Sequence, residues 1–201
     1  MTADGPRTPN DVRPSTLLAT LRRVVDPLNA PEAPPPPGRR PAAVLLLADP
    51  VDASLHFIVR SDRVSEHRGQ IAFPGGGAEA ADTWIGDTAL RETAEEMGIA
   101  GDDVELIGRL PSLLTAVSNR WLTPLVGILR RPAVVVADPF EVAEWFRVPL
   151  AALLTAPHRI EAVAYEGGER LVHCYDVDGR VIWGVTGAIV QELLERLGRR
   201  D

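Results

Sequence analysis

Three acidic residues crowd the end of a segment that has the periodicity of a helix. Glu92, Glu95 and Glu96 are followed by Gly98, a residue type that commonly ends helices in a left-handed conformation. At about 100° per residue, the three acids fall within one third of the helix circumference. Like charges at this spacing repel one another, and the negative end of the helix dipole adds to the cost. A bound divalent cation would offset the repulsion, because hard cations take carboxylate oxygens and also bind substrate phosphates.

A run of glycines stands before this helical segment. Gly75, Gly76 and Gly77 follow Phe73-Pro74 and form a candidate loop. A charge run is most often a solvated face of a helix, and that alternative accounts for the acids. It accounts neither for the glycines nor for the position of the acids at the helix end. A metal site accounts for all three features, and we predict one here.

The helical segment also carries a family resemblance. Residues 91–99, Arg-Glu-Thr-Ala-Glu-Glu-Met-Gly-Ile, resemble the second half of the Nudix box, G-x5-E-x7-R-E-U-x-E-E-x-G-U, where U is a bulky apolar residue. Gly77 stands at the first glycine, but the first glutamate of the box falls on Thr83. Asp82 is the nearest acid, and it has the right spacing when the count starts at Gly76. The resemblance implies an enzyme that hydrolyses nucleoside diphosphates linked to another group, with Mg²⁺ or Mn²⁺ as cofactor.

The resemblance also implies which residues hold the metal. Glu92 and Glu96 are expected to be ligands, together with the backbone carbonyl of Gly76 or Gly77. Glu95 is expected either to bind the metal or to accept the proton of the attacking water.

Other acids and one arginine complete the expected catalytic group. Arg91 is expected to orient a glutamate rather than to touch substrate. A later loop often supplies one more acid in this family; Glu141 is our choice and Glu144 is the alternative. The general base stays open among Glu95, Glu92 and Glu141.

The segment before the glycines carries a second resemblance. Residues 60–76 are similar to the signature found upstream of the box in Nudix hydrolases that act on coenzyme A, roughly L-L-T-x-R-[SA]-x3-R-x3-G-x3-F-P-G-G. The matching positions are Arg60, Ser61, Gly69, Phe73, Pro74, Gly75 and Gly76. The middle arginine is replaced by Ser65. The preferred substrate is therefore coenzyme A or an acyl derivative, giving 3′,5′-ADP and a phosphopantetheine moiety.

Basic residues in this segment suit such a substrate. Coenzyme A carries a 3′-phosphate besides its diphosphate, and arginine forks bind phosphates well. Ordinary surface arginines on a loop are the alternative. We predict that the substrate-binding wall consists of Arg60, Arg63, His67, Arg68, Gly75 and Gly76.

Two other functions stay open at this stage. One is hydrolysis of another nucleoside diphosphate derivative, such as ADP-ribose, because the Ser65 position departs from the coenzyme A signature. The other is a Nudix-fold binding module with little catalysis, because Thr83 replaces the first glutamate of the box.

The remaining chain predicts one α/β domain with an extension. Residues 1–38 are expected to hold a short helix, with Leu17 and Leu21 on its apolar face, and a proline-rich linker; residues 39–201 form the Nudix domain. The resemblance implies an α/β/α sandwich in which the box forms a loop–helix–loop around a mixed sheet. Strands are predicted at 42–48 (buried and central), 55–60, 104–110, 123–129, 134–136, 160–163 and 170–176, with a turn at Gly167-Gly168 and a final helix to about Leu197.

Composition limits the partners. A formal charge of −7 argues against general binding to nucleic acid phosphates, so a small nucleotide is the expected partner. Cys174 is the single cysteine, which excludes an internal disulfide framework. The start of the chain lacks the apolar segment of a signal peptide and no apolar run has membrane-spanning length, so we expect a cytoplasmic protein without membrane contact. A homodimer remains open.

Overall fold

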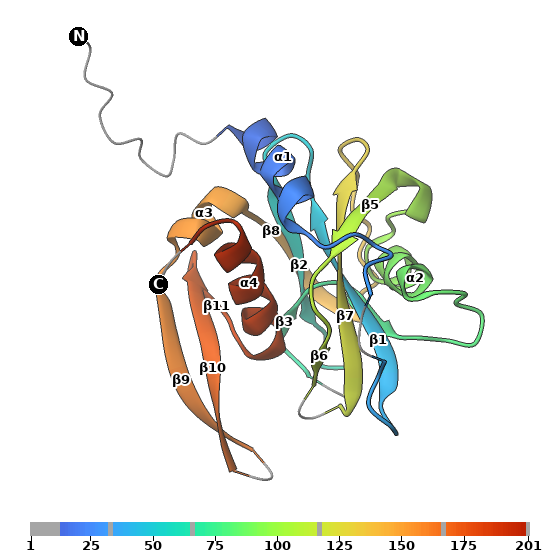
Figure 1. Ribbon diagram of the computed structural model, residues 1–201, viewed down its shortest axis with the longest axis vertical. Helices are drawn as coiled ribbons and strands as arrows, with labels where there is room; N and C mark the ends of the chain where they lie inside the picture. The colour runs from blue at the N-terminus through green and yellow to red at the C-terminus, as the bar shows by residue number, and fades with distance from the viewer. Residues whose placement is uncertain (1–12, 32–33, 65–66, 116–117, 166–167, 200–201) are drawn as a thin grey trace.

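The central strand of the fold is β1 (Arg40–Ala48), which lies within the main sheet of the computed structural model (Figure 1). The structure describes residues 13–31, 34–64, 67–115, 118–165 and 168–199. Side chains alternate between the two faces of a strand. Along β1, Ala42 and Leu46 join one apolar core, whereas Leu45 and Leu47 join another. The predicted central strand is therefore confirmed, and it is buried on both faces.

The main sheet is mixed. Within the described residues it follows the order β3-β2-β1-β7-β5, with β4 paired to β1, β6 to β7 and β8 to β2. Only the β1–β7 pairing is parallel among these. The strands are β2 (Ser54–Arg60), β3 (Ile71–Ala72), β4 (Gly75–Gly77), β5 (Val104–Arg109), β6 (Leu113–Leu114), β7 (Arg120–Leu129) and β8 (Val142–Pro149).

Helices cover both faces of this sheet (Figure 1). Helix α2 (Ile85–Met97) packs on one face through Ala89 and Met97. The other face is covered by α1 (Pro14–Val24), α3 (Leu150–Thr155) and α4 (Gly184–Arg196). A 3₁₀ turn, η2 (Gly101–Asp103), leads from α2 to β5. The architecture is an α/β/α sandwich with a mixed sheet, as the sequence predicts.

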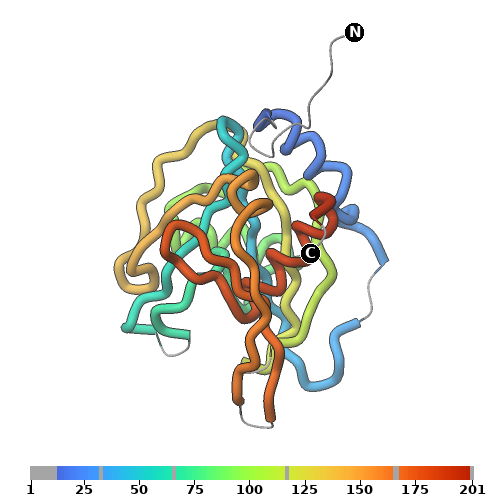
Figure 2. Tube along the Cα trace, turned by 90° about the vertical axis from the view of Figure 1, so that its left-hand side faces the viewer, coloured from blue at the N-terminus to red at the C-terminus, as the bar shows by residue number. Residues whose placement is uncertain are grey.

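A second sheet extends the side of the molecule that carries α4. Its strands are β9 (His158–Tyr165), β10 (Gly168–Val177) and β11 (Arg180–Ile182), all antiparallel, and α4 packs on β10. Figure 2 shows β9 and β10 projecting together as a long hairpin. The predicted hairpin is confirmed, although Gly167 at its turn lies outside the described residues.

The predicted strand at 134–136 is wrong. This segment is irregular, and the side chain of Val134 is 85% exposed. Its backbone serves the end of α2 instead: the N–H of Val136 donates to the carbonyl of Met97, and the N–H of Asp138 donates to the carbonyl of Glu96. The last carbonyls of a helix lack partners within the helix, so this segment satisfies them. It also leads the chain directly into Glu141.

Helix α1 belongs to the main apolar core. Leu17 and Leu21 are buried in it, and the guanidinium of Arg22 makes two hydrogen bonds of 2.7 Å with the carboxylate of Glu105 on β5. Within the described residues, no helix has the length and apolar character needed to cross a membrane. The domain boundary near residue 39 stays a prediction, but the short helix before it is part of the packed structure.

Removing residues 1–38 is therefore expected to lower the free energy of unfolding by about 3–6 kcal/mol. Burial of one leucine side chain contributes about 1.5–3 kcal/mol, and Leu17 and Leu21 would both leave the core. Urea unfolding measures the change. A chain that begins at Arg13 is the control, since it keeps every described contact of α1. Equal stability of the two shortened chains would contradict the prediction.

Candidate active site

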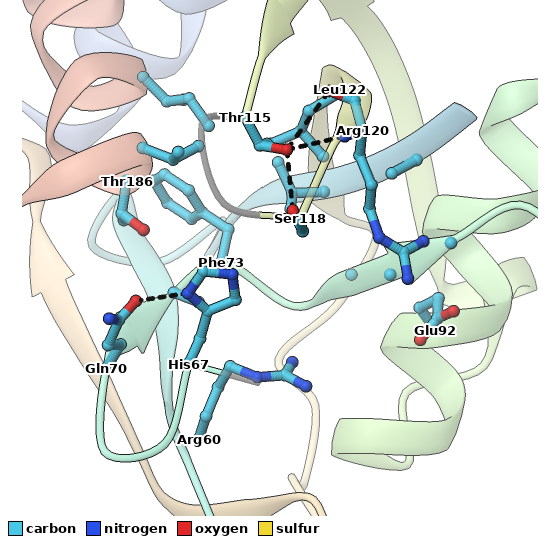
Figure 3. Close-up of a pocket in the computed structure, with 18 of the residues that line it drawn as sticks. Arg60, His67, Gln70, Phe73, Glu92, Thr115, Ser118, Arg120, Leu122 and Thr186 are labelled. Carbon is cyan, nitrogen blue, oxygen red and sulfur yellow. Dashed lines mark hydrogen bonds between the residues drawn. The ribbon is translucent and has the colours of Figure 1, made fainter. Parts of the chain in front are cut away.

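A cavity of about 300 Å³ with charged residues in its lining opens between α2, β4 and the end of β2 (Figure 3). Its charged lining residues are Arg60, Glu92, Glu96, Arg120 and Glu141. They come from four separate parts of the chain: β2, α2, the start of β7 and the segment before β8. The fold therefore gathers acids and arginines that are far apart in sequence around one space.

Three carboxylates converge in this cavity. Glu92, Glu96 and Glu141 each offer an oxygen atom, and these atoms lie within 4.8 Å of one another. The backbone carbonyl of Glu141 accepts a 2.8 Å hydrogen bond from the N–H of Ser61, which fixes its loop against the end of β2. Glu144, the alternative to Glu141, lies outside the group and pairs with Arg180. Of the two candidate acids, the structure brings only Glu141 to the other glutamates.

Burial makes this group of acids electrostatically costly. The side chain of Glu96 is fully buried, and this burial raises its pKa to about 8. Its partners are the N–H of Gly75, at 2.8 Å from Oε2, and Nη1 of Arg60, at 3.3 Å from Oε1. Burial also raises the pKa of Glu92, with further contributions from Glu95 and Glu141. Two guanidinium groups contact these acids, Arg60 at Glu96 and Arg91 at Glu92, and two positive charges do not balance three neighbouring carboxylates.

The glycines of β4 let charged side chains approach the backbone. A Cβ atom at Gly76 would overlap the carboxylate of Glu92, and a Cβ atom at Gly77 would overlap the guanidinium of Arg120. The backbone of Gly76 therefore lies directly against Glu92. Converging carboxylate oxygens beside an accessible backbone form an oxygen-only donor set, which suits a hard divalent cation. The residues present fit the predicted metal.

Asp82 supplies the acid that the family register places at Thr83. Its carboxylate accepts two 3.2 Å hydrogen bonds from Nε and Nη2 of Arg91 and a 2.8 Å hydrogen bond from the hydroxyl of Thr88. These contacts, those of Arg91 first, lower the pKa of Asp82 to about 2. Thr83 instead donates to Asp87 in the first turn of α2. The carboxylate is thus present, one residue earlier than the family register places it.

Arg91, on α2, links this acid to two glutamates of the same helix. Its Nη1 donates to Oε1 of Glu92 at 3.1 Å and to Oε2 of Glu95 at 3.0 Å, and its Nη2 donates to the carbonyl of Gly77 at 2.9 Å. The placement matches the expectation that Arg91 orients a glutamate. The side chain of Glu95 is 53% exposed and lies outside the group of three, so the structure does not place it as the sequence predicts.

Asp82→Asn is expected to lower kcat/KM by about 10- to 100-fold, the usual cost of losing a group that positions metal ligands. The substitution weakens the contacts that hold Arg91 against Glu92 and Gly77. Steady-state kinetics with the preferred substrate measures the loss. Asp102→Asn is the matched control, because Asp102 is exposed on η2. Full activity of Asp82→Asn would show that Arg91 needs no such support.

The predicted substrate wall is only partly assembled. Arg60, His67, Gly75 and Gly76 line the cavity. Arg60 faces Glu96, so its guanidinium lies at the metal end of the cavity. His67 lies farther along, where its Nδ1 is 3.0 Å from Oε1 of Gln70 (Figure 3).

Two arginines predicted for the wall lie outside it. Arg63 and Arg68 are exposed and are absent from the lining of the cavity. The Nε of Arg68 donates to the carbonyl of Val64 at 2.8 Å, which turns the side chain back on its own loop. Ser65, which replaces the middle arginine of the signature, lies outside the described residues.

Sequence reasoning missed Arg120. Its side chain reaches from the start of β7 toward the side of the cavity that holds Glu92 (Figure 3). Among the residues that the structure describes, no carboxylate pairs with it. Arg120 lies opposite Arg40 in the parallel β1–β7 ladder, and β4 pairs with the other side of β1. The pairing of β1 with β7 and β4 thus brings Arg120 to the cavity, and the sequence around Arg120 does not indicate this pairing.

Sequence comparisons identify the family of this chain. A family model described as NUDIX domain matches residues 38–167. The chain is 36% identical over 174 residues to the uncharacterized Nudix hydrolase NudL of Photorhabdus laumondii subsp. laumondii, which covers 83% of this chain and 92% of that protein. It is 35% identical over 164 residues to NudL of Citrobacter koseri, covering 81% and 85%. A MutT protein from Methanosarcina mazei Go1 is a solved structure with 17% identity and a TM-score of 0.48, covering 59% of this chain and 83% of that chain. The chain belongs to the Nudix hydrolase family.

Proposed function

We propose that this Nudix hydrolase cleaves the diphosphate bond of coenzyme A or acyl-coenzyme A, releasing 3′,5′-ADP and the corresponding phosphopantetheine. The observation that carries diphosphate hydrolysis is one cavity in which Glu92, Glu96 and Glu141 converge and into which Arg120 reaches, with no acid partner among the described residues. The choice of coenzyme A rests on the likeness of residues 60–76 to the coenzyme A signature.

The proposed chemistry begins with charge. A divalent cation, Mg²⁺ or Mn²⁺, held by the three glutamates would neutralise diphosphate oxygens and acidify a bound water. The N–H of Gly75 holds Oε2 of Glu96, and Arg91 holds Oε1 of Glu92, so two of the ligands are oriented before substrate arrives. Arg120, which points toward Glu92 (Figure 3), binds the phosphate charge, because a guanidinium fork suits an anionic phosphate.

The proton of the attacking water needs an acceptor in the cavity. Glu92 and Glu141 both line it, whereas Glu95 does not. We therefore assign the general base to Glu92 or Glu141. Burial raises the pKa of Glu92, which makes its carboxylate a stronger base.

Asp82 bears on the alternative of a binding module with little catalysis. That alternative is motivated by the missing glutamate at Thr83, and the contacts of Asp82 with Arg91 remove the motivation. A substrate such as ADP-ribose shares the diphosphate but lacks the pantetheine arm, so the two hydrolytic functions differ outside the metal cavity.

Product identification tests the proposal. The purified enzyme with Mg²⁺ or Mn²⁺ is expected to release 3′,5′-ADP from coenzyme A, and to do so faster than it cleaves ADP-ribose. Glu144→Gln is a suitable control, because this exposed acid pairs with Arg180 away from the cavity. Preferential cleavage of ADP-ribose would overturn the assignment of coenzyme A as the substrate, but the assignment of diphosphate hydrolysis would stand. No cleavage of either compound would overturn both.

The proposal extends to partners and location. A net charge of −7 favours a small nucleotide rather than nucleic acid as the ligand. We propose a cytoplasmic enzyme, in line with its single cysteine. A homodimer is the assembly to test by sedimentation.

A further inference from the structure

A second cavity, of about 530 Å³, adjoins the first. It lies between β6, the hairpin of β9 and β10, and the start of α4. Its lining is mainly apolar and includes Leu114, Leu171, Trp183, Val185 and Ala188.

The two cavities share a wall. His67, Gln70, Thr115 and Val185 line both of them. In Figure 3, His67, Gln70 and Thr115 lie on the side of the first cavity that is away from Glu92. A ligand with its diphosphate at the glutamates can therefore continue past these residues into the second cavity.

The lining of the second cavity suits an uncharged chain. Leu171 is 70% exposed, and Leu114 and Trp183 are each 37% exposed, so large apolar side chains face solvent here. No carboxylate stands among its described lining residues. Arg170 is exposed, and Nδ1 of His173 lies 2.9 Å from Nε2 of His158. Covering such exposed apolar surface with an apolar group removes it from water, which makes binding of that group favourable.

We propose that the second cavity is a binding subsite for the acyl chain of an acyl-thioester substrate, so that the enzyme prefers acyl-coenzyme A to free coenzyme A. The inference rests on the proposed function, because the diphosphate must occupy the first cavity. Continuity of the two cavities favours the substrate's own chain over any other occupant. A second copy of the protein covering this face would instead close the subsite.

Kinetics with a series of acyl chains tests the proposal. KM is expected to fall from free coenzyme A to hexanoyl- and decanoyl-coenzyme A, by up to about fourfold for each methylene group buried. Ala188→Phe places a large side chain in the second cavity and is expected to abolish this dependence on chain length. Ala19→Phe on the exposed face of α1 is the matched control and should keep the dependence.

A second variant tests the subsite if Ala188→Phe does not fold, and a binding measurement tests it if no coenzyme A compound is hydrolysed. Leu171→Asn changes an exposed strand residue and should weaken the dependence on chain length without disturbing the core. Calorimetry with S-decanoylpantetheine, which has no phosphate, should show binding that Ala188→Phe removes. If no coenzyme A compound is cleaved but this binding persists, the proposed function fails and the apolar subsite stands. A KM independent of chain length, or binding insensitive to Ala188→Phe, would overturn the subsite.

Discussion

Glu96→Gln is expected to stabilise the metal-free protein and to lower turnover by roughly 100-fold or more. The side chain of Glu96 is fully buried, and its pKa of about 8 lies above the ordinary value of 4.5. Glutamine keeps an acceptor for the N–H of Gly75 but carries no charge. The same change removes a proposed metal ligand, and metal ions supply several kcal/mol of transition-state stabilisation.

The effect on stability depends on pH in a defined direction. The folded protein binds the proton of Glu96 more tightly than the unfolded chain does. Its contribution to stability is therefore fully present below pH 4.5 and is lost as the pH rises through 8. Over this range the loss amounts to about 5 kcal/mol. Glu96→Gln should remove this part of the pH dependence.

Urea unfolding in EDTA between pH 5 and pH 8 measures the difference between the two proteins. Added Mg²⁺ or Mn²⁺ should raise the melting temperature of the unmodified protein, and more at pH 8 than at pH 6, because the metal replaces the proton of Glu96. Glu96→Gln should lose this shift, whereas Glu144→Gln should keep it. A Glu96→Gln protein that is less stable than the unmodified protein at pH 8 would contradict the assignment of a charged, buried ligand.

The features that could be predicted from the sequence are those with local causes. The apolar run at 42–48 predicts a strand buried on both faces, and β1 is that strand. Gly98 predicts the end of the catalytic helix, and its φ of +68° gives the left-handed conformation that ends α2. These residues act within a few positions of themselves, so neighbouring sequence is sufficient evidence.

The features that the sequence did not predict depend on distant contacts. The segment 134–136 has the composition of a strand, but the N–H of Val136 donates to the carbonyl of Met97 at the end of α2. Asp82 replaces Thr83 only because the loop before α2 carries it to Arg91. Spacing along a helix does not decide any of these.

Arg120 gives the second large expected effect. Arg120→Met is expected to lower kcat/KM by about 10- to 100-fold, because a charge-assisted hydrogen bond contributes about 1.5–3 kcal/mol. Methionine keeps much of the apolar length of the side chain but removes the guanidinium that lies beside Gly77. No described carboxylate loses a partner, so the melting temperature should change little. Arg131→Met is the control, since Arg131 is largely exposed and pairs with Asp103.

A comparison of two substrates shows which phosphate Arg120 binds. Coenzyme A and 3′-dephospho-coenzyme A share the diphosphate and differ in the 3′-phosphate. Because Arg120 points toward Glu92, at the metal end of the cavity (Figure 3), we expect Arg120→Met to lower kcat/KM equally for both compounds. Arg63 and Arg68 lie outside the cavity, so they can contact the 3′-phosphate but not the diphosphate. Any decrease in kcat/KM caused by Arg63→Met or Arg68→Met should therefore be seen with coenzyme A and not with 3′-dephospho-coenzyme A. A loss with Arg120→Met that is confined to coenzyme A would move Arg120 to the 3′-phosphate, and no loss with either compound would remove it from the site.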